Sequence, residues 1–396
     1  KYHCTELGRK VSNDAMDVHG GKGICLGPNN YLGRGWIAAP IAITVEGANI
    51  LTRSLIIYGQ GAIRCHPFVL RELAAAGDED IDRGLIEFDD ALFGHIGYAI
   101  SNVARSFFLA LTHAKFSSVP LNTPTRRYYQ NINRYSAAFA LASDFAMLTL
   151  GGDLKKRELL SARLGDVLSS IYLASCVLKH FENQGRRATD LPLVEWSIRT
   201  LMYQAQEALH SFLRNLPNRW AATFLRIFIF PRGRTYSAPS DELVHKVVEL
   251  ATTPGEARER LSQQAYTTTE PGNPIGLLEE ALQLSIELAP LERRLRQAYK
   301  EGLIRSEYLG EQIGEAASAE IINKDEAAKL RDYHEKVFSL LSVDDFAPED
   351  LRRTTGRQAD EPSPKPAKKA AKRKQAPRKK VSGKKKVSSK KKTEAE

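Results

Sequence analysis

Cysteine is scarce in this sequence, and the spacings that build metal sites are missing. Cys4, Cys25, Cys65 and Cys176 stand far apart in 396 residues, and no two of them form a Cys-x-x-Cys pair. This scarcity excludes a zinc finger and a disulfide framework, and it suits a reducing compartment. The sequence also contains no HExxH, GxSxG or phosphate-loop motif. We therefore expect no metal site.

Long apolar runs and strand patterns are equally rare. No run of about 18 apolar residues occurs, so no spanning helix is expected. Phe224 to Phe230 is the only strand candidate. Helical patterns dominate instead, and they cover Leu85 to Ala114, Asn131 to Thr149, Leu154 to Glu182, Leu193 to Leu216, Asp241 to Leu250, Pro274 to Tyr299 and Lys324 to Leu341. The sequence predicts an all-α fold, with 42% apolar residues to build its cores.

Positive charge is confined to one end of the chain. Residues 361–396 hold 15 Lys and Arg against 3 acids, whereas residues 1–360 carry a net charge of −2. A near-neutral body argues against a nucleic-acid-binding domain, which needs a basic face. The Lys-rich tail has almost no apolar content, so we expect it to be disordered. Its charge would give at most weak, salt-sensitive contact with nucleic acid or an anionic membrane.

Glycine, by contrast, is concentrated near the start. Ten of the 27 glycines fall within residues 1–65. Thr5 to His19 has the spacing of an amphipathic helix, which Gly20 and Gly21 should end. A buried helix is expected from Gly47 to about Arg64. The chain begins with Lys1 rather than Met, and we expect it to be a piece of a longer protein.

Two short motifs in this region could carry chemistry. In His19-Gly20-Gly21-Lys22-Gly23, the paired glycines either cap a helix or let the backbone approach a ligand such as a diphosphate. About 25 residues later, Glu46 follows nine uncharged residues and precedes Gly47. Glu46 is either a salt-bridged helix start or, if buried, a general base with a raised pKa. Composition and spacing leave these alternatives open.

The residues of these two motifs resemble those of a known protein family. Residues 14–23, Asp-Ala-Met-Asp-Val-His-Gly-Gly-Lys-Gly, and residues 44–53, Thr-Val-Glu-Gly-Ala-Asn-Ile-Leu-Thr-Arg, resemble the C-terminal helical domain of acyl-CoA dehydrogenases. That family has a helix ending in Gly-Gly-x-Gly, followed by a Glu-Gly-Thr/Ala-Asn block that opens another helix. Residues 64–67, Arg-Cys-His-Pro, and the helical stretch to about Asp350 look like the large bacterial long-chain members, which append a helical domain.

The resemblance implies a cofactor, a reaction and site residues. Glu46 would remove the α-proton of a fatty acyl-CoA while FAD takes the β-hydride, which gives the trans-2-enoyl-CoA of fatty-acid β-oxidation. The backbone N–H of Glu46 would help to hold the thioester carbonyl, and Gly47 would leave room for the substrate. Gly20 and Gly21, with Asp17 and Ala48, would approach FAD, in this family usually that of a neighbouring subunit. Asp17 and Ala48 stand where the family often has Gln and Thr.

The same resemblance suggests an organisation and partners. We expect a dehydrogenase helical region in residues 1–115, an appended helical domain in residues 116–350 and the Lys-rich tail in residues 351–396. The partners would be long- or medium-chain acyl-CoA, a second subunit in a homodimer and an electron-transfer acceptor. The location would be cytoplasmic, with contact to the inner membrane surface. Alone, the fragment is not expected to be active. The alternative is a non-catalytic helical scaffold whose basic tail docks to nucleic acid or membrane.

Two weaker features have competing interpretations. Trp220 to Phe230, followed by Pro-Arg-Gly-Arg, is either a buried core segment or a membrane-surface element. His95, His113 and His180 lie in helical patterns and are expected to be ordinary packed or surface residues.

Overall fold

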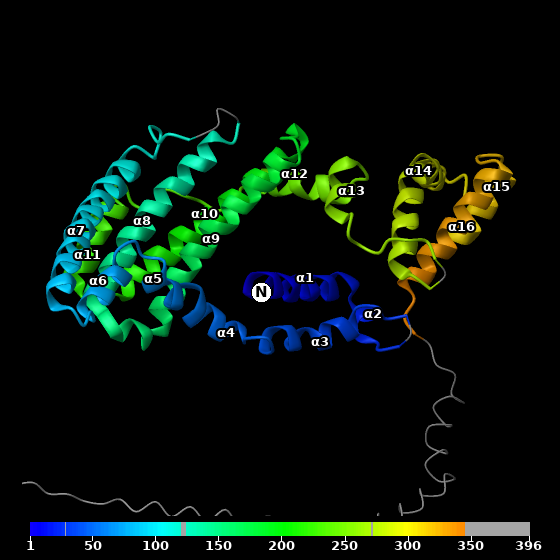
Figure 1. The fold of residues 1–396 in the computed structure, drawn as a ribbon. Coiled ribbons are helices and arrows are strands. Elements are labelled where there is room, and N and C mark those ends of the chain that lie inside the picture. Colours follow the sequence, from blue (N-terminus) through cyan, green and yellow to red (C-terminus); the bar gives the residue numbers. More distant parts are fainter. Residues whose placement is uncertain (28, 120–123, 271, 345–396) are drawn as a thin grey trace, which may run out of the picture. The chain divides into compact units, whose positions relative to one another are not determined.

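The computed structural model describes residues 1–27, 29–119, 124–270 and 272–344, and these residues contain helices but no strand (Figure 1). The α-helices are α1 (Tyr2–His19), α2 (Gly21–Ile24), α3 (Gly33–Thr44), α4 (Asn49–Leu51), α5 (Gly61–Arg64), α6 (Val69–Ala76), α7 (Ile81–Leu111), α8 (Arg126–Leu150), α9 (Glu158–Asn183), α10 (Leu191–Asn215), α11 (Arg219–Ile229), α12 (Asp241–Thr252), α13 (Glu256–Ser262), α14 (Pro274–Lys300), α15 (Leu309–Ser318) and α16 (Lys324–Leu341). A π-helix, η1 (Thr52–Gln60), and two 3₁₀ turns, η2 (Gly151–Lys155) and η3 (Ala188–Asp190), complete them. The all-α prediction is confirmed.

The main hydrophobic core lies among α8, α9, α10 and α11. It is made of fully buried side chains such as Leu141, Leu164, Leu209, Phe212 and Leu225. Each of these helices places apolar residues three or four positions apart, so one face of each is turned to the common core. α7 packs against α8 and α11 and so closes one side of the group (Figure 1).

The strand candidate at Phe224 to Phe230 is helical instead: the segment lies in α11 up to Ile229, and Phe230 is the C-cap of that helix. Asn218 caps the helix by accepting a hydrogen bond from the N–H of Ala221 at 3.0 Å. Ala222, Leu225 and Ile229 then follow at helical spacing and are buried. A short apolar run cannot distinguish a strand from a buried helix by periodicity alone. The core interpretation of Trp220 to Phe230 agrees with this burial, although Trp220 itself is 88% exposed.

A continuous helical rod leads from the Glu46 motif into the core. α4, η1 and α5 follow one another from Asn49 to Arg64, and η1 packs along α9. Gly165 of α9 makes the close approach possible, since a β-carbon there would lie 3.2 Å from the carbonyl oxygen of Arg53. The Arg53 guanidinium donates to both carboxylate oxygens of Asp166, at 2.8 and 2.5 Å. Tyr58 inserts into the core, and burial raises its pKa to about 12.

The helix expected from Gly47 to Arg64 therefore exists, but it is less buried than predicted. Asn49, Ser54 and Tyr58 are buried, whereas Ile50 is 75% exposed and Leu51 is 43% exposed. The rod packs along α9, and the start of α1 lies against Asn49, but Ile50 and Leu51 stay open to solvent.

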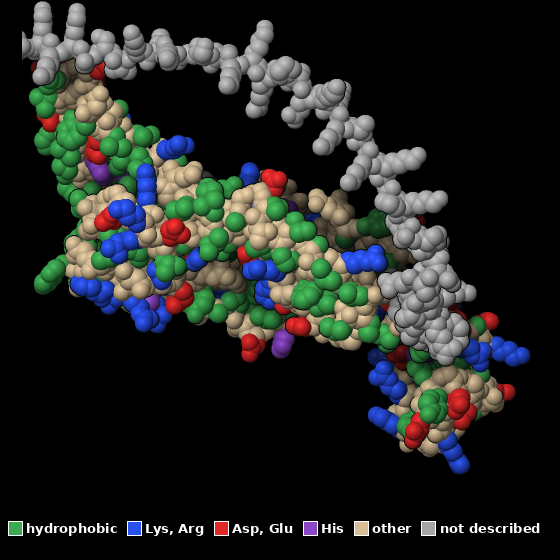
Figure 2. Space-filling model, turned by 90° about the horizontal axis from the view of Figure 1, so that it is seen from below, with side chains coloured by type: hydrophobic (Ala, Val, Ile, Leu, Met, Phe, Trp, Pro, Cys, Tyr) green, Lys and Arg blue, Asp and Glu red, His purple; other side chains and the backbone are tan. Residues whose placement is uncertain are grey.

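The first three helices form a separate layer that exposes its apolar side chains. α1 and α3 pack side by side, and the indole N–H of Trp36 donates to Asn13 at 2.6 Å (Figure 1). Neither helix buries a large apolar residue. The exposed ones are Leu7, Val11, Val18, Trp36, Ile37, Ile41 and Val45. Figure 2, seen from below, shows hydrophobic side chains on the face to which α3 contributes.

A second, smaller core lies among α14, α15 and α16. Leu288, Leu295, Ile313 and Leu330 are its buried members. Asn323 and Glu326 cap α16 reciprocally, since each side chain accepts a hydrogen bond from the backbone N–H of the other. At its other end, the ammonium of Lys22 donates to the carbonyl oxygens of Leu340 and Ser342, at 2.5 and 3.1 Å. A cation at a helix C-terminus satisfies the last carbonyls.

α8 is the one helix that is long and apolar enough to cross a membrane by length and composition, within the part of the chain that the structure describes. Its ten buried residues are directed into the protein, however, as in the core helix of a globular domain. α3 together with the rod from Asn49 to Arg64 passes the same test only as a pair bent by 45°.

Residues 345–396 lie outside the described residues, so the expected disorder of the Lys-rich tail stays a prediction. The domain boundaries after residues 115 and 350 also stay predictions.

The burial pattern of α9 predicts where the fold is most sensitive. Leu164 is fully buried, whereas Leu159 on the same helix is 68% exposed. We expect Leu164→Ala to lower the free energy of unfolding by about 2–5 kcal/mol, because it leaves a cavity in the main core. Leu159→Ala is the matched control and should change it by less than about 0.5 kcal/mol. Urea unfolding followed by circular dichroism measures both, and equal effects would contradict the core described above.

Candidate functional site

Glu46 occupies the turn between α3 and α4, in a backbone conformation that side chains rarely adopt. Its φ is 55°, and that of Gly47 is 80°. A left-handed conformation at a residue other than glycine costs about 1–3 kcal/mol, and strained residues of this kind cluster at active sites and ligand-binding segments. His113, Ala114, Arg186 and Glu320 also have positive φ values in this chain. The N–H groups of Glu46 and Gly47 donate no hydrogen bond to any described residue. The turn thus presents a carboxylate beside two N–H groups that remain free to bind an oxygen.

A polar network from α1 holds this turn in place. Asn49 is 3% exposed, and its amide donates to the hydroxyl of Thr5 at 2.9 Å and to the carboxylate of Glu6 at 2.8 Å. The ammonium of Lys1 donates to the Asn49 side-chain oxygen at 2.7 Å and to the carbonyl oxygen of Gly47 at 3.0 Å. Sequence reasoning quoted Asn49 within the motif but assigned it no role. The sequence gives one indication of this role, an amide side chain at the start of a helix. The same pattern is also typical of an ordinary helix cap, so it does not identify the role.

Gly20 and Gly21 lie at the other end of the α1–α3 layer, where the chain passes from α1 into α2 (Figure 1). Gly20 has φ 55°, so a side chain there would be strained. Gly21 has no such φ, and no described atom lies within 4 Å of where its β-carbon would be. Neither backbone conformation nor packing within the described residues explains a glycine at position 21. Asp17, one turn earlier, is exposed.

The two motifs are too far apart to line one small pocket. They stand at opposite ends of α1, whose 18 residues span about 27 Å. Glu46 and its neighbours Gly47 and Ala48 therefore form one half-site, and Gly20, Gly21 and Asp17 form another. The structure does not bring the sequence-predicted site residues together within one chain.

The dry pocket expected around Glu46 is not formed by the described residues. The Glu46 side chain is exposed, as are Gly47 and the neighbouring Val45 and Ile50. Glu46 was expected to act as a general base only if it were buried, and the described residues do not bury it. A wall over Glu46 has to come from residues other than those described.

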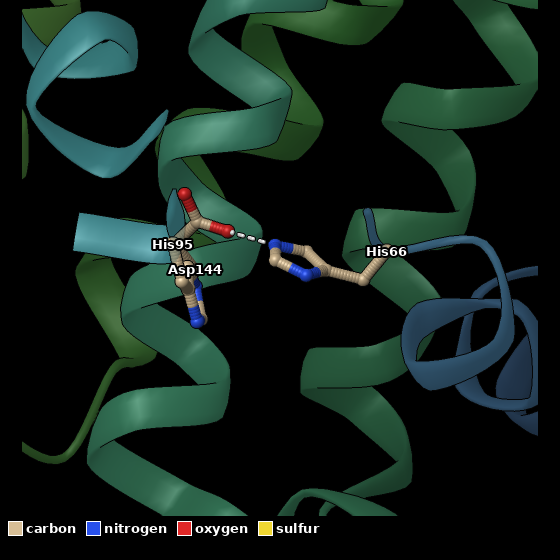
Figure 3. Close-up of side chains that lie close together, drawn as sticks. All are labelled: His66, His95 and Asp144. Atoms are coloured by element: carbon tan, nitrogen blue, oxygen red, sulfur yellow. Dashed lines mark hydrogen bonds and ion pairs between the residues drawn. The ribbon is translucent and has the colours of Figure 1, made fainter. Parts of the chain in front are cut away.

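A second cluster of chemically active side chains joins α7, α8 and the α5–α6 junction (Figure 3). His66 Nε2 donates to Asp144 Oδ1 at 2.9 Å, and these side chains are 6% and 7% exposed. The ring of His95 lies 4.6 Å from that of His66, centroid to centroid, and its Nδ1 pairs with Glu72 at 2.7 Å. Sequence reasoning missed this cluster, because 78 residues separate His66 from Asp144.

The hydrogen bonds of His66 argue against a metal in this cluster. One possible ligand atom from each of His66, His95 and Asp144 lies within 4.8 Å of the others, which is close enough to share an ion. His66 Nδ1, however, accepts hydrogen bonds from the N–H groups of Phe68 and Val69, both at 3.2 Å. The ring proton must therefore be on Nε2, which then has no lone pair for a metal. The cluster is a hydrogen-bonded link between helices.

The family model for the C-terminal domain of bacterial-type acyl-CoA dehydrogenases matches residues 63–346, which is more than half of the chain. The match begins after Glu46 and the two glycines, and it includes His66, His95 and Asp144. No solved structure matches this chain.

The His66–Asp144 link predicts an asymmetric response to substitution. His66→Leu should lower the free energy of unfolding by about 3–5 kcal/mol, because it leaves the Asp144 carboxylate buried without its partner. His180→Leu, on the exposed side of α9, is the control and should change it by less than about 0.5 kcal/mol. Urea unfolding at neutral pH measures both. A Zn²⁺-dependent rise in melting temperature that His66→Leu abolishes would instead support a metal site.

Proposed function

Because the chain belongs to the bacterial-type acyl-CoA dehydrogenase C-terminal family, we propose that it supplies the catalytic base of an FAD-dependent acyl-CoA dehydrogenase. The family supports a dehydrogenase role in general, acting on acyl-CoA and working as an oligomer. The finer proposal is the α,β-dehydrogenation of long- or medium-chain fatty acyl-CoA to trans-2-enoyl-CoA in β-oxidation. The reduced flavin then passes its electrons to a separate acceptor.

The observation that carries this proposal is the conformation of the Glu46 turn. The turn places a carboxylate next to the unpaired N–H groups of Glu46 and Gly47. An N–H donor aimed at the thioester carbonyl stabilises the negative charge that develops as the α-proton leaves. The adjacent carboxylate takes that proton. Both functions therefore come from one short segment, which Asn49 and Lys1 hold rigidly against α1.

The exposed apolar layer supports the view that this is one half of an active site. α1 and α3 leave Trp36, Ile37 and Ile41 open to solvent beside the Glu46 turn. Contiguous exposed apolar surface marks a place where another part of a protein or a ligand binds. Covering it would also remove water from Glu46, and desolvation raises the basicity of a carboxylate.

The residues at the other end of the layer fit the proposed cofactor. A β-carbon at Gly21 meets no described atom, so the glycine leaves space that a flavin phosphate or ribose could fill. FAD supplies the acceptor for the β-hydride when bound. The span of α1 separates Gly20 and Gly21 from Glu46, which fits contact with the flavin of a neighbouring subunit in a homodimer. Asp17 and Ala48 are the further cofactor contacts in this proposal.

The proposal extends to location. We place the enzyme in the cytoplasm, with the net charge of +12 in residues 361–396 allowing weak contact with the anionic inner membrane surface.

The role of Glu46 is tested by removing its basicity while keeping its size. In the active enzyme that contains this chain, Glu46→Gln should lower the rate of flavin reduction by acyl-CoA by at least about 10²–10⁴, the usual contribution of a general base. Bound flavin should remain, because glutamine keeps the size of the side chain and none of the proposed cofactor contacts is changed. Stopped-flow absorbance of the flavin measures the rate. A near-normal rate in the Gln variant would falsify the assignment.

The role of Gly21 is tested by adding a side chain where the chain itself has room. Gly21→Val should release FAD or weaken the dimer while the unfolding transition of the helical body stays in place. Gly8→Val is the matched control, since Gly8 is an exposed glycine of α1 with equally open surroundings. Flavin content by absorbance and dimer content by sedimentation are the measurements. Stoichiometric flavin in a dimeric Gly21→Val enzyme would count against the proposal.

A further inference from the structure

Arg134 of α8 carries a positive charge into the protein without a carboxylate to balance it. The residue is only 2% exposed. Its guanidinium has neutral partners: it donates to the hydroxyl of Thr235 at 3.0 Å, and its Cζ lies 5.7 and 5.3 Å from the ring centroids of Tyr135 and Tyr236. No acid pairs with it within the described residues. Buried charges are normally paired, because an opposite charge offsets the hydration that is lost on burial.

Three more cations surround the same place. Burial lowers the pKa of His113, in the turn that follows α7, and four positive side chains lower it further: Arg134, Arg232, Lys115 and Arg127. They belong to that turn, to α8 and to the segment after α11. In the part of the chain that the structure describes, none of the four forms an ion pair. This local excess of positive charge, in a body whose net charge is −2, favours an anion.

The two glutamates of α10 in this region already have partners. Glu207 pairs with Arg234 at 2.9 Å, and Glu195 pairs with Arg199 at 2.7 Å. Neither carboxylate is therefore left to neutralise Arg134. The missing negative charge has to come from outside the residues that the structure describes, and a ligand is one way to supply it.

A cleft of about 160 Å³ adjoins the buried charge, between α8, α10 and the segment after α11. Thr235 links the two, since its hydroxyl accepts the hydrogen bond of Arg134 and its side chain lines the cleft. A hydroxyl that accepts from a guanidinium still has its own proton to donate, and no described acceptor takes it. The other lining residues offer polar groups, an aromatic ring and apolar carbon: Tyr128, Asn131, Ile198, Arg199, Met202, Tyr236 and Ser237.

We propose that this cleft binds the phosphate group of a small phosphate ester. Thr235 and Asn131 donate hydrogen bonds to the phosphate oxygens. Arg134 acts through Thr235: by donating to the hydroxyl oxygen it directs the hydroxyl proton to the cleft and makes it a stronger donor. A phosphate with two negative charges balances more of the four cations than a carboxylate does.

The rest of the ester lies against the apolar part of the cleft. Tyr128, Ile198 and Met202 provide this wall. The volume of the cleft is below the range of about 300–1,000 Å³ that is typical of sites for larger ligands. The ligand is therefore a small soluble molecule. This site involves neither Glu46 nor the two glycines, so it does not rest on the proposed dehydrogenase chemistry and can be tested without flavin or acyl-CoA.

The response of the full chain to phosphate tests the charge balance. Inorganic phosphate should raise the melting temperature above its value in chloride at the same ionic strength, because a ligand that binds only the folded state stabilises it. Equal ionic strength removes the general screening effect of salt. Phenyl phosphate should bind more tightly than inorganic phosphate, because its ring contacts the apolar wall. Differential scanning calorimetry and isothermal titration calorimetry are the measurements.

Two substitutions assign the binding to this site. Arg134→Met keeps the bulk of the side chain, removes its charge and should abolish the response to phosphate. Thr235→Val removes one hydroxyl at an exposed position, so it should leave folding intact while raising the dissociation constant for phenyl phosphate at least about tenfold. Arg214→Met and Thr223→Val, at exposed positions of α10 and α11, are the matched controls and should behave as the unmodified chain. If Arg134→Met does not fold, Thr235→Val decides the question.

Four results would overturn the proposal. These are equal melting temperatures in phosphate and chloride, unchanged binding of phenyl phosphate by Thr235→Val, an equal loss of binding in Arg214→Met, and binding of phenyl phosphate no tighter than that of inorganic phosphate. Vesicles that contain phosphatidic acid separate a lipid headgroup from a soluble ester. Retention on these vesicles without any response to phenyl phosphate would also overturn the proposal, because the cleft would then not be the binding site.

Discussion

The close contact between η1 and α9 is the constraint on which the arrangement of this chain depends. The carbonyl of Arg53 approaches α9 at Gly165, where any β-carbon would be only 3.2 Å away. The Arg53–Asp166 ion pair and the buried ring of Tyr58 fasten the same segment. η1 joins the Glu46 turn to the main core. The position of Glu46, six residues before the start of η1, is therefore set by how closely two helical backbones pack.

The apolar side chains of this molecule fall into two groups, those buried in the core and those exposed on its surface. The residues that build the main core are packed like those of any helical domain, and their burial is complete within the chain. The α1–α3 layer and the outward face of α7, with Ile86, Phe93 and Ile100, by contrast, leave large apolar side chains in water. Both surfaces are ordered by contacts on their inner sides, so each presents a preformed shape. In energetic terms, burial stabilises the core within the chain, whereas these outer apolar side chains add no such stabilisation while they are exposed.

The sequence predicted the long helices well because their apolar periodicity coincides with the cores they build. α7, α9, α10, α14 and α16 all lie where helical spacing placed them. The same reasoning failed for Phe224 to Phe230, since a short apolar run carries no period of its own. It also overestimated the burial of the rod from Asn49 to Arg64, because an apolar face indicates that something is packed there without saying whether the partner is in the same chain.

The candidate site was predictable only in part, for a related reason. Glu46, Gly20 and Gly21 stood out as local motifs, and Gly20 and Gly47 have positive φ values in the structure. The separation of the two motifs by the length of α1 followed only from the antiparallel packing of α1 on α3. The link between His66 and Asp144 joins elements far apart in the sequence, and no spacing rule relates a loop histidine to an aspartate in a later helix.

The π-helical winding of η1 has a consequence for how this region can change in evolution. A π-helix has more residues in each turn than an α-helix, and such segments are usually short. Losing one residue between Thr52 and Gln60 could return the segment to α-helical winding, with no break in the rod. It would also change the angle between the parts on either side, so that the Glu46 turn and the His66 link would no longer face their present directions. Substitutions on the outer side of η1 should thus be tolerated far more readily than a change in its length. Among related chains, the number of residues between Glu46 and His66 should therefore vary less than the identity of those residues.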